Sequence, residues 1–145
     1  FDLAGEITPN GSILASYAYI DARITKTASN SEKDFDMQRP STPRHSGNIW
    51  TKYIITEGPL KHLGFGAGYN FVTERYGQVG RRANTTIYPG YGLVNAVLYY
   101  KINQIQFQAN LNNILNKTHW VGGYDKLRSF PGAPRNVNIS ISYKF

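Results

Sequence analysis

Three absences narrow the possibilities for this sequence. It has no cysteine, so it forms no disulfide, although a cysteine-free chain is compatible with any cellular compartment. It has no apolar run of about 18 residues, which excludes a transmembrane helix. It also lacks an N-terminal methionine and any stretch that resembles a signal peptide, and residues 1–6 read like the middle of a strand. We therefore expect the chain to be part of a longer one.

Tyrosine and glycine, by contrast, are abundant. The sequence has 11 Tyr and 14 Gly, and its mean hydropathy is -0.42 although 41% of its residues are hydrophobic. This composition favours strands and turns over helices. A negative mean hydropathy does not exclude a membrane barrel, because half of each barrel strand faces water.

The chain is basic, with a formal net charge of +7 at pH 7. A nucleic-acid-binding surface gathers its basic residues on one helix face or in one run. Here they are scattered through turns and loops, as at Arg23, Lys26, Arg44, Arg81, Arg82 and Lys126. We therefore expect no nucleic-acid partner; the charge belongs either to solvated loops or to the attraction of an anionic lipid or ligand.

The clearest pattern lies in residues 135–145. Apolar and polar residues alternate there without a slip, so one face of the strand is apolar and the other polar. The apolar residues are Val137, Ile139, Ile141, Tyr143 and Phe145. Strands of membrane barrels alternate in this way over about 9–11 residues, with aromatic residues at the membrane interfaces.

Six more strands precede this one. We predict them at residues 1–7, 13–24, 44–56, 63–74, 91–100 and 104–112. Short turns at 8–12, 57–62 and 101–103 alternate with long loops at 25–43, 75–88 and 117–134. Long loops at one end and short turns at the other predict an all-β fold, an antiparallel up-and-down transmembrane β-barrel segment. A soluble sandwich normally breaks this alternation with Greek-key crossings.

Alternation also predicts which side chains share a face. We expect one set to face lipid: Phe65, Ala67, Tyr69, Phe107, Ala109, Ile139 and Ile141. We expect a second set to face the lumen: Gln106, Gln108, Asn110 and Asn138. In the strand at 13–24, Leu14, Ala18 and Ile20 share one face, and Tyr17 and Tyr19 line the other.

No motif predicts catalysis or a metal site, and we expect the protein not to be an enzyme. Gly64, Gly66 and Gly68 lie inside a strand rather than before a helix, so they predict a thinned inner face and not a phosphate loop. The histidines, His45, His62 and His119, are too scattered for metal-ligand spacing. Neither a pair of carboxylates nor a nucleophile elbow is present.

Five segments resemble those of TonB-dependent siderophore receptors. The resemblance covers essentially the whole chain, and the segments occur in the same order as in the family. They are Gly5–Thr8, Ser16–Tyr19, Thr42–Tyr53, the penultimate-strand motif Asn110–Lys117, and Gly132–Arg135 followed by a strand that ends in Tyr143–Phe145.

The resemblance implies a barrel of about 22 strands around an N-terminal plug. Residues 1–145 would form the C-terminal portion of the barrel domain, about its last seven strands, and the plug domain would be absent from this chain. It also implies the bacterial outer membrane as location, with membrane lipid and the barrel-assembly machinery as partners. Tyr143 and Phe145 would form the C-terminal assembly signal.

The resemblance further implies transport of a ferric siderophore, energised by the TonB complex through the missing N-terminal region. The siderophore chelates the iron, so no cofactor bound by protein ligands is expected. Trp120 and Tyr124, in the last long loop, are candidate siderophore contacts, and Arg81, Arg82 and Lys126 favour an anionic one. For these aromatics, and for Phe130, an interfacial girdle or packing within the loop is the alternative.

Two other classes remain open. A soluble β-sandwich that binds a ligand or carbohydrate through its loop aromatics would need polar outer faces on strands such as Leu63–Phe71 and Ile105–Leu111, or a second sheet to cover them. A small complete outer-membrane barrel conflicts with an odd number of strands, because bacterial single-chain barrels have an even number.

Overall fold

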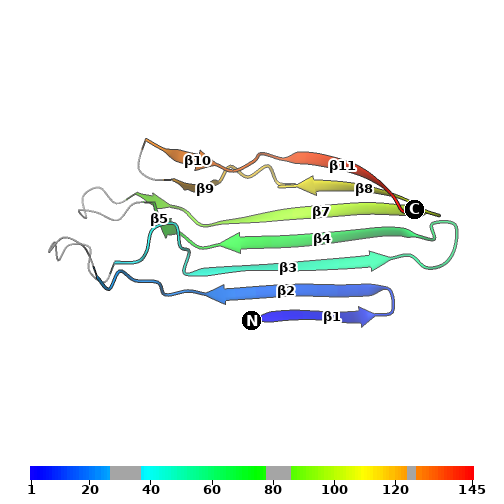
Figure 1. Cartoon of the computed structure of the whole chain (residues 1–145), viewed down its shortest axis with the longest axis horizontal. Helices are drawn as coiled ribbons and strands as arrows, with labels where there is room; N and C mark the ends of the chain where they lie inside the picture. The colour runs from blue at the N-terminus through cyan, green and yellow to red at the C-terminus, as the bar shows by residue number, and fades with distance from the viewer. Residues whose placement is uncertain (27–36, 78–85, 124–126) are drawn as a thin grey trace.

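The computed structural model describes residues 1–26, 37–77, 86–123 and 127–145. Its main element is a seven-stranded sheet in the order β1-β2-β3-β4-β7-β8-β11, and all neighbouring pairs are antiparallel. The strands are β1 (Asp2–Thr8), β2 (Gly11–Tyr19), β3 (His45–Ile54), β4 (Leu63–Val72), β7 (Tyr91–Ile102), β8 (Ile105–Asn112) and β11 (Asn136–Tyr143). Figure 1 shows them side by side in one layer, with the long connections at one end. The predicted up-and-down order is confirmed.

Two of the long connections contain short hairpins, which the prediction of plain loops missed. β5 (Arg75–Tyr76) pairs with β6 (Ile87–Tyr88), and β9 (Trp120–Gly123) pairs with β10 (Ser129–Pro131). These strands are rich in aromatic and β-branched residues, which favour extended backbone. Neither hairpin belongs to the hydrogen-bonded ladder of the main sheet.

Most strand ends lie within two residues of the prediction, and the end of β2 differs most. β2 ends at Tyr19 instead of residue 24, because its partner β3 begins only at His45, after Pro43, and proline has no N–H for the ladder. The last short turn comprises residues 103–104 instead of the predicted 101–103, since Ile102 pairs with Ile105 across it. Asn103 turns the chain there with a φ of 50°, a left-handed conformation that asparagine tolerates.

The register assigns every side chain to one of two faces, because directly opposed residues of antiparallel strands point to the same side. The apolar face includes all seven residues predicted to share it, together with Ile49, Leu98 and Leu111. The polar face includes Asn48, Trp50, Lys52, Gly64, Gly66, Gly68, Asn70, Asn95, Tyr99, Gln106, Gln108, Asn110 and Asn138.

The sequence separated the side chains of β2 into two sets but did not show which set lies on the apolar face of the sheet. Leu14 is opposite Trp50 and therefore belongs to the polar face. Tyr17 and Tyr19 belong to the apolar face, where both rings lie near His45 at the long-loop end. They form an aromatic rim above the aliphatic middle of the sheet, as membrane barrels have at their interfaces.

The sheet has no conventional core. Its accessible surface is 10396 Å², whereas a compact monomer of this mass exposes about 7500 Å². Among the described residues, Tyr88 is the one large hydrophobic side chain that is buried, while Phe65, Leu98 and Ile139 on the apolar face are exposed. No second sheet covers that face within the described residues, so the requirement of the soluble sandwich is not met.

The described ranges contain no helix with the length and apolarity needed to cross a bilayer.

Candidate functional site

The polar face is thinned along β4, as its glycines predicted. The ring of Trp50 lies against Gly68 and the ring of Tyr99 lies against Gly64, so closely that a Cβ at either glycine would overlap the ring. The side chains that pack close are therefore those of the neighbouring strands, β3 and β7.

A shallow hollow of about 250 Å³ lies on this face beside the rings. It is lined by Trp50, Lys52, Val97, Tyr99, Gln106, Gln108 and Asn110. The ammonium of Lys52 stands 4.9 Å from the centre of the Tyr99 ring, within the range of a cation–π interaction. Amides, aromatic rings and one cation suit polar contacts with another surface and offer no acid–base pair.

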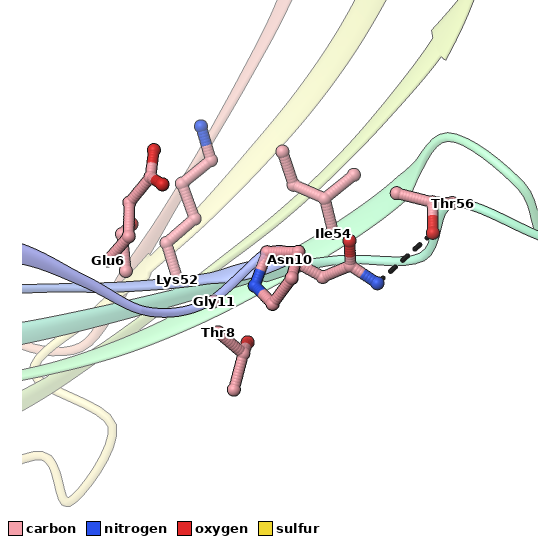
Figure 2. Close-up of a pocket in the computed structure, with 9 residues that line it drawn as sticks. Glu6, Thr8, Asn10, Gly11, Lys52, Ile54 and Thr56 are labelled. Carbon is pink, nitrogen blue, oxygen red and sulfur yellow. Dashed lines mark hydrogen bonds between the residues drawn. The ribbon is translucent and has the colours of Figure 1, made fainter.

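A second hollow of about 250 Å³ lies at the short-turn end of the same face (Figure 2). Asn10 donates a hydrogen bond from Nδ2 to Oγ1 of Thr56 at 3.1 Å, which ties the β1–β2 turn to the end of β3. Glu6 and Lys52 project toward the same side of the sheet in Figure 2. Glu6 is the single carboxylate that lines the hollow, so the paired carboxylates of general acid–base catalysis are missing from it.

At the long-loop end the structure gathers a buried polar cluster, which we call the loop-base cluster: Arg75, Tyr88, Tyr91, Asn113 and His119. Four of its members are the buried side chains of the described ranges, with exposed fractions of 3% for Tyr88, 4% for Arg75, 3% for Asn113 and 7% for His119. The prediction missed this cluster, because its residues come from four connections and strands far apart in the chain. The aromatic residues of the predicted loops were the available signal.

Contacts of the Tyr91 ring link Arg75 to His119 within this cluster. The guanidinium of Arg75 lies 5.5 Å from the centre of the Tyr91 ring, and the Tyr91 ring lies 4.5 Å from that of His119. His119 packs against Gly132, and Nδ1 of His119 lies 3.1 Å from the carbonyl oxygen of Lys117. The cluster thus joins β5 and β7 to the segment that leads into β9.

Asn113 fixes the path of the chain where it leaves β8. Its side-chain Nδ2 donates to the carbonyl oxygens of Lys117 (2.9 Å) and Ala133 (3.1 Å), and its Oδ1 accepts from the N–H of Lys117 (2.9 Å). Its backbone has a φ of 51° and donates to Oδ1 of Asn95. Nδ2 of Asn95 in turn donates to Oδ1 of Asn70. The motif therefore builds a rigid exit from β8.

The predicted ligand residues are only partly described. Trp120 opens β9, its side chain is 36% exposed, and its carbonyl oxygen accepts a hydrogen bond from Nη2 of Arg75. Phe130 lies on the paired strand β10 and is also exposed. Tyr124, Arg81, Arg82 and Lys126 lie outside the described residues.

The predicted assembly signal ends the main sheet. Tyr143 is the last residue of β11, and its hydroxyl donates to Oε1 of Gln104 at 2.7 Å. Phe145 is fully exposed, and its ring meets the Tyr143 ring edge-on, with centroids 5.1 Å apart.

The histidines occupy unrelated places. His45 accepts or donates a 2.7 Å hydrogen bond with the Tyr17 hydroxyl on the apolar face, His62 lies in the turn before β4, and His119 is in the loop-base cluster. Within the described part of the chain, no group of three or more His, Asp or Glu side chains lies close enough to hold a metal ion.

Comparison with known proteins identifies the fold. Residues 1–114 match the family model described as TonB dependent receptor-like, beta-barrel. The chain belongs to the TonB-dependent receptor family. As part of an outer-membrane barrel of this family, it places its apolar face toward lipid and its polar face toward the lumen.

Several named receptors are similar over the whole length of the chain. The metal-pseudopaline receptor CntO of Pseudomonas aeruginosa (strain UCBPP-PA14) is 30% identical over 100% of this chain and 20% of the relative. The crystal structure of the siderophore receptor PiuA from Acinetobacter baumannii is 29% identical, covers 99% of this chain and 21% of that one, and superposes with a TM-score of 0.79.

The fold extends to more distant receptors. The ferric-catecholate import receptor Fiu from E. coli K12 superposes with a TM-score of 0.80 at 24% identity, over 99% of this chain and 20% of Fiu. The chain thus spans about a fifth of the length of these relatives.

Proposed function

We propose that residues 1–145 are the C-terminal portion of the barrel of an outer-membrane receptor that imports a ferric siderophore. The observation that carries this proposal is similarity along the whole chain to receptors named for such ligands: PiuA is described as a probable TonB-dependent siderophore receptor and is 30% identical over 99% of this chain. The plug domain and the segment that contacts the TonB complex would lie in the remainder of the protein.

The proposed activity is binding and transport, not catalysis. The siderophore chelates the iron and the protein binds the chelate, so protein side chains need not ligate the metal. This division agrees with the two hollows of the polar face, which are lined mainly by amides, hydroxyls and aromatic rings, with Glu6 and Lys52 as their charged side chains.

We further propose that Trp120 and Tyr124 contact the siderophore and that Arg81, Arg82 and Lys126 favour an anionic one. Trp120 supports this proposal, because an exposed tryptophan on a hairpin at the long-loop end offers a large rigid contact area. Among the similar proteins is a catecholate siderophore receptor, Fiu of E. coli, 29% identical over 99% of this chain. Ferric catecholate complexes are anions.

Uptake of radioactive iron tests the function. The whole receptor is expressed in a strain that lacks its own siderophore receptors, and the iron is presented either as a ferric catecholate complex or as cationic ferrioxamine B. We expect uptake of the catecholate complex to require both the receptor and an active TonB system. Absence of uptake and of binding with both probes would contradict the proposal, and a preference for ferrioxamine B would contradict the anionic ligand.

The ligand residues are tested by the double substitution Trp120→Ala and Tyr124→Ala. We expect weaker binding of the ferric catecholate at unchanged surface expression. The matched control is Tyr19→Ala, which removes an aromatic ring at the same end of the barrel but from the apolar face. An affinity equal to that of the wild type would remove Trp120 and Tyr124 from the site.

A further inference from the structure

The position of the β9–β10 hairpin depends on side chains. This hairpin does not join the backbone ladder of the main sheet, and within the described residues it is tied to its surroundings by a few side-chain contacts. One is the pair of hydroxyls of Tyr88 and Ser129, whose oxygens lie 3.0 Å apart. Another is the hydrogen bond from Arg75 to the carbonyl oxygen of Trp120. The second contact acts on the backbone of the residue proposed to meet the ligand.

Arg75 holds the start of β9 from two directions. Its Nη2 bonds the carbonyl oxygen of Trp120, which is 45 residues away in sequence. Its guanidinium also lies over the ring of Tyr91, and that ring contacts His119, the residue before Trp120. The carbonyl oxygen of His119 accepts a 2.9 Å hydrogen bond from the N–H of Gly132, which closes the base of the hairpin. The backbone on both sides of the His119–Trp120 peptide bond is thereby restrained.

A contribution to stability does not by itself explain a buried arginine at residue 75. Its side chain is 4% exposed, it forms no ion pair with any residue that the structure describes, and Nη1 has no hydrogen-bond partner there. A buried charge without a carboxylate costs free energy, and an apolar side chain of similar volume would stabilise the fold better. What an apolar side chain cannot provide is a rigid donor aimed at one carbonyl.

We propose that Arg75 is the positioning residue for Trp120: it orients the start of β9 so that the indole meets the siderophore. This inference rests on the proposed function, because it assigns a cause to the placement of a proposed ligand contact. Arg75 itself, being buried, does not touch the ligand.

The test uses the whole receptor in detergent micelles, labelled with 5-fluorotryptophan, and measures two quantities. The first is the 19F resonance of residue 120, assigned by its loss in Trp120→Phe. The second is the Kd of a ferric catecholate complex. The variants are Arg75→Met, Arg75→Lys, Trp120→Ala and the double variant Arg75→Met with Trp120→Ala. Lys101→Met is the control, because it removes a cation from the opposite end of the polar face.

We expect Arg75→Met to shift the resonance of residue 120 and to raise Kd about tenfold, the size typical of a binding hot spot. Arg75→Lys keeps the charge without the planar donor and should give an intermediate shift. The double variant should bind no more weakly than Trp120→Ala alone, because both substitutions then remove the same contact. Lys101→Met should leave both quantities unchanged.

Two results would overturn the inference: an unchanged resonance in Arg75→Met, or effects of Arg75→Met and Trp120→Ala on Kd that multiply in the double variant. The proposed ligand contact fails separately, if Trp120→Ala alone leaves Kd unchanged. In that case the resonance still decides whether Arg75 positions Trp120. If Arg75→Met does not fold, the same criteria apply to Arg75→Lys.

Discussion

The ring of Trp50 on β3 lies across Gly68 on β4, directly opposite it in the register, in space that a side chain at residue 68 would otherwise occupy. Tyr99 on β7 covers Gly64 in the same way. Alternate glycines in β4 thus let two large rings lie flat against the inner wall of the barrel.

A side chain at residue 68 should therefore destabilise the barrel. Gly68→Val forces the Trp50 ring away from β4. We expect the free energy of unfolding to fall by about 1–3 kcal/mol, as it does at other overpacked sites. The urea-unfolding midpoint of the whole receptor in micelles measures it. Gly5→Ala is the control, because a Cβ at Gly5 meets nothing within 4 Å. Equal midpoints for both variants would show that Trp50 moves aside freely.

The assignment of faces predicts opposite responses at neighbouring positions of β8. Ala109 lies between Leu98 and Ile139 in the middle of the apolar face, whereas Gln108 lies on the polar face between Tyr99 and Ser140. Arginine at residue 109 must enter the lipid and should cost about 2–4 kcal/mol, while arginine at residue 108 should cost much less. Unfolding titrations in lipid vesicles compare the two. Equal tolerance would contradict the assignment.

Substitution of Asn113 should lower the stability of the protein for two separable reasons. Asn113→Gly keeps the left-handed backbone but removes three half-buried hydrogen bonds to the backbone of Lys117 and Ala133, which should cost about 1–3 kcal/mol. Asn113→Ala adds the strain of a positive φ, about 1–2 kcal/mol more. The order of thermal-unfolding midpoints should be wild type, then glycine, then alanine. An alanine variant as stable as the glycine variant would exclude the backbone contribution.

Phe145 offers a test of the proposed assembly signal. The side chain is fully exposed and touches mainly Tyr143, so its loss should barely change the stability of the folded sheet. If the assembly machinery reads it, Phe145→Ala should lower the amount of receptor in the outer membrane several-fold. Heat-modified gel mobility measures the folded fraction. Leu115→Ala removes an exposed apolar side chain at the other end of the sheet and should have no such effect.

Residues 1–145 in isolation should aggregate in buffer without detergent. The edge strands β1 and β11 each present one row of N–H and C=O groups that no strand in the described residues pairs, and such rows favour association between edges. The apolar face, with Phe65, Leu98 and Ile139 exposed, adds a patch that soluble monomers do not tolerate. Light scattering measures the aggregation. A soluble monomer with cooperative unfolding would overturn this prediction.

Much of the fold was predictable because its signals are local. A period of two along β8 and β11 assigns each residue to one of two faces without knowledge of any partner, and loop length alone separates the two ends of the sheet. For the same reason Phe107 and Ile139 were correctly grouped on one face. Segments such as Asn110–Lys117 carried the family resemblance within eight consecutive positions.

The remaining features depend on contacts between residues far apart in the chain. Leu14 and Ala18 suggested an apolar face for β2, but the register with β3 puts Leu14 beside Trp50 on the polar side. The loop-base cluster arises because the short strands β5, β6, β9 and β10 meet at the long-loop end, where Arg75 reaches the carbonyl oxygen of Trp120. Periodicity within a strand does not predict such long-range contacts. These contacts depend on the register between strands and on the hydrogen bonds that buried polar groups require. Both are properties of the assembled sheet.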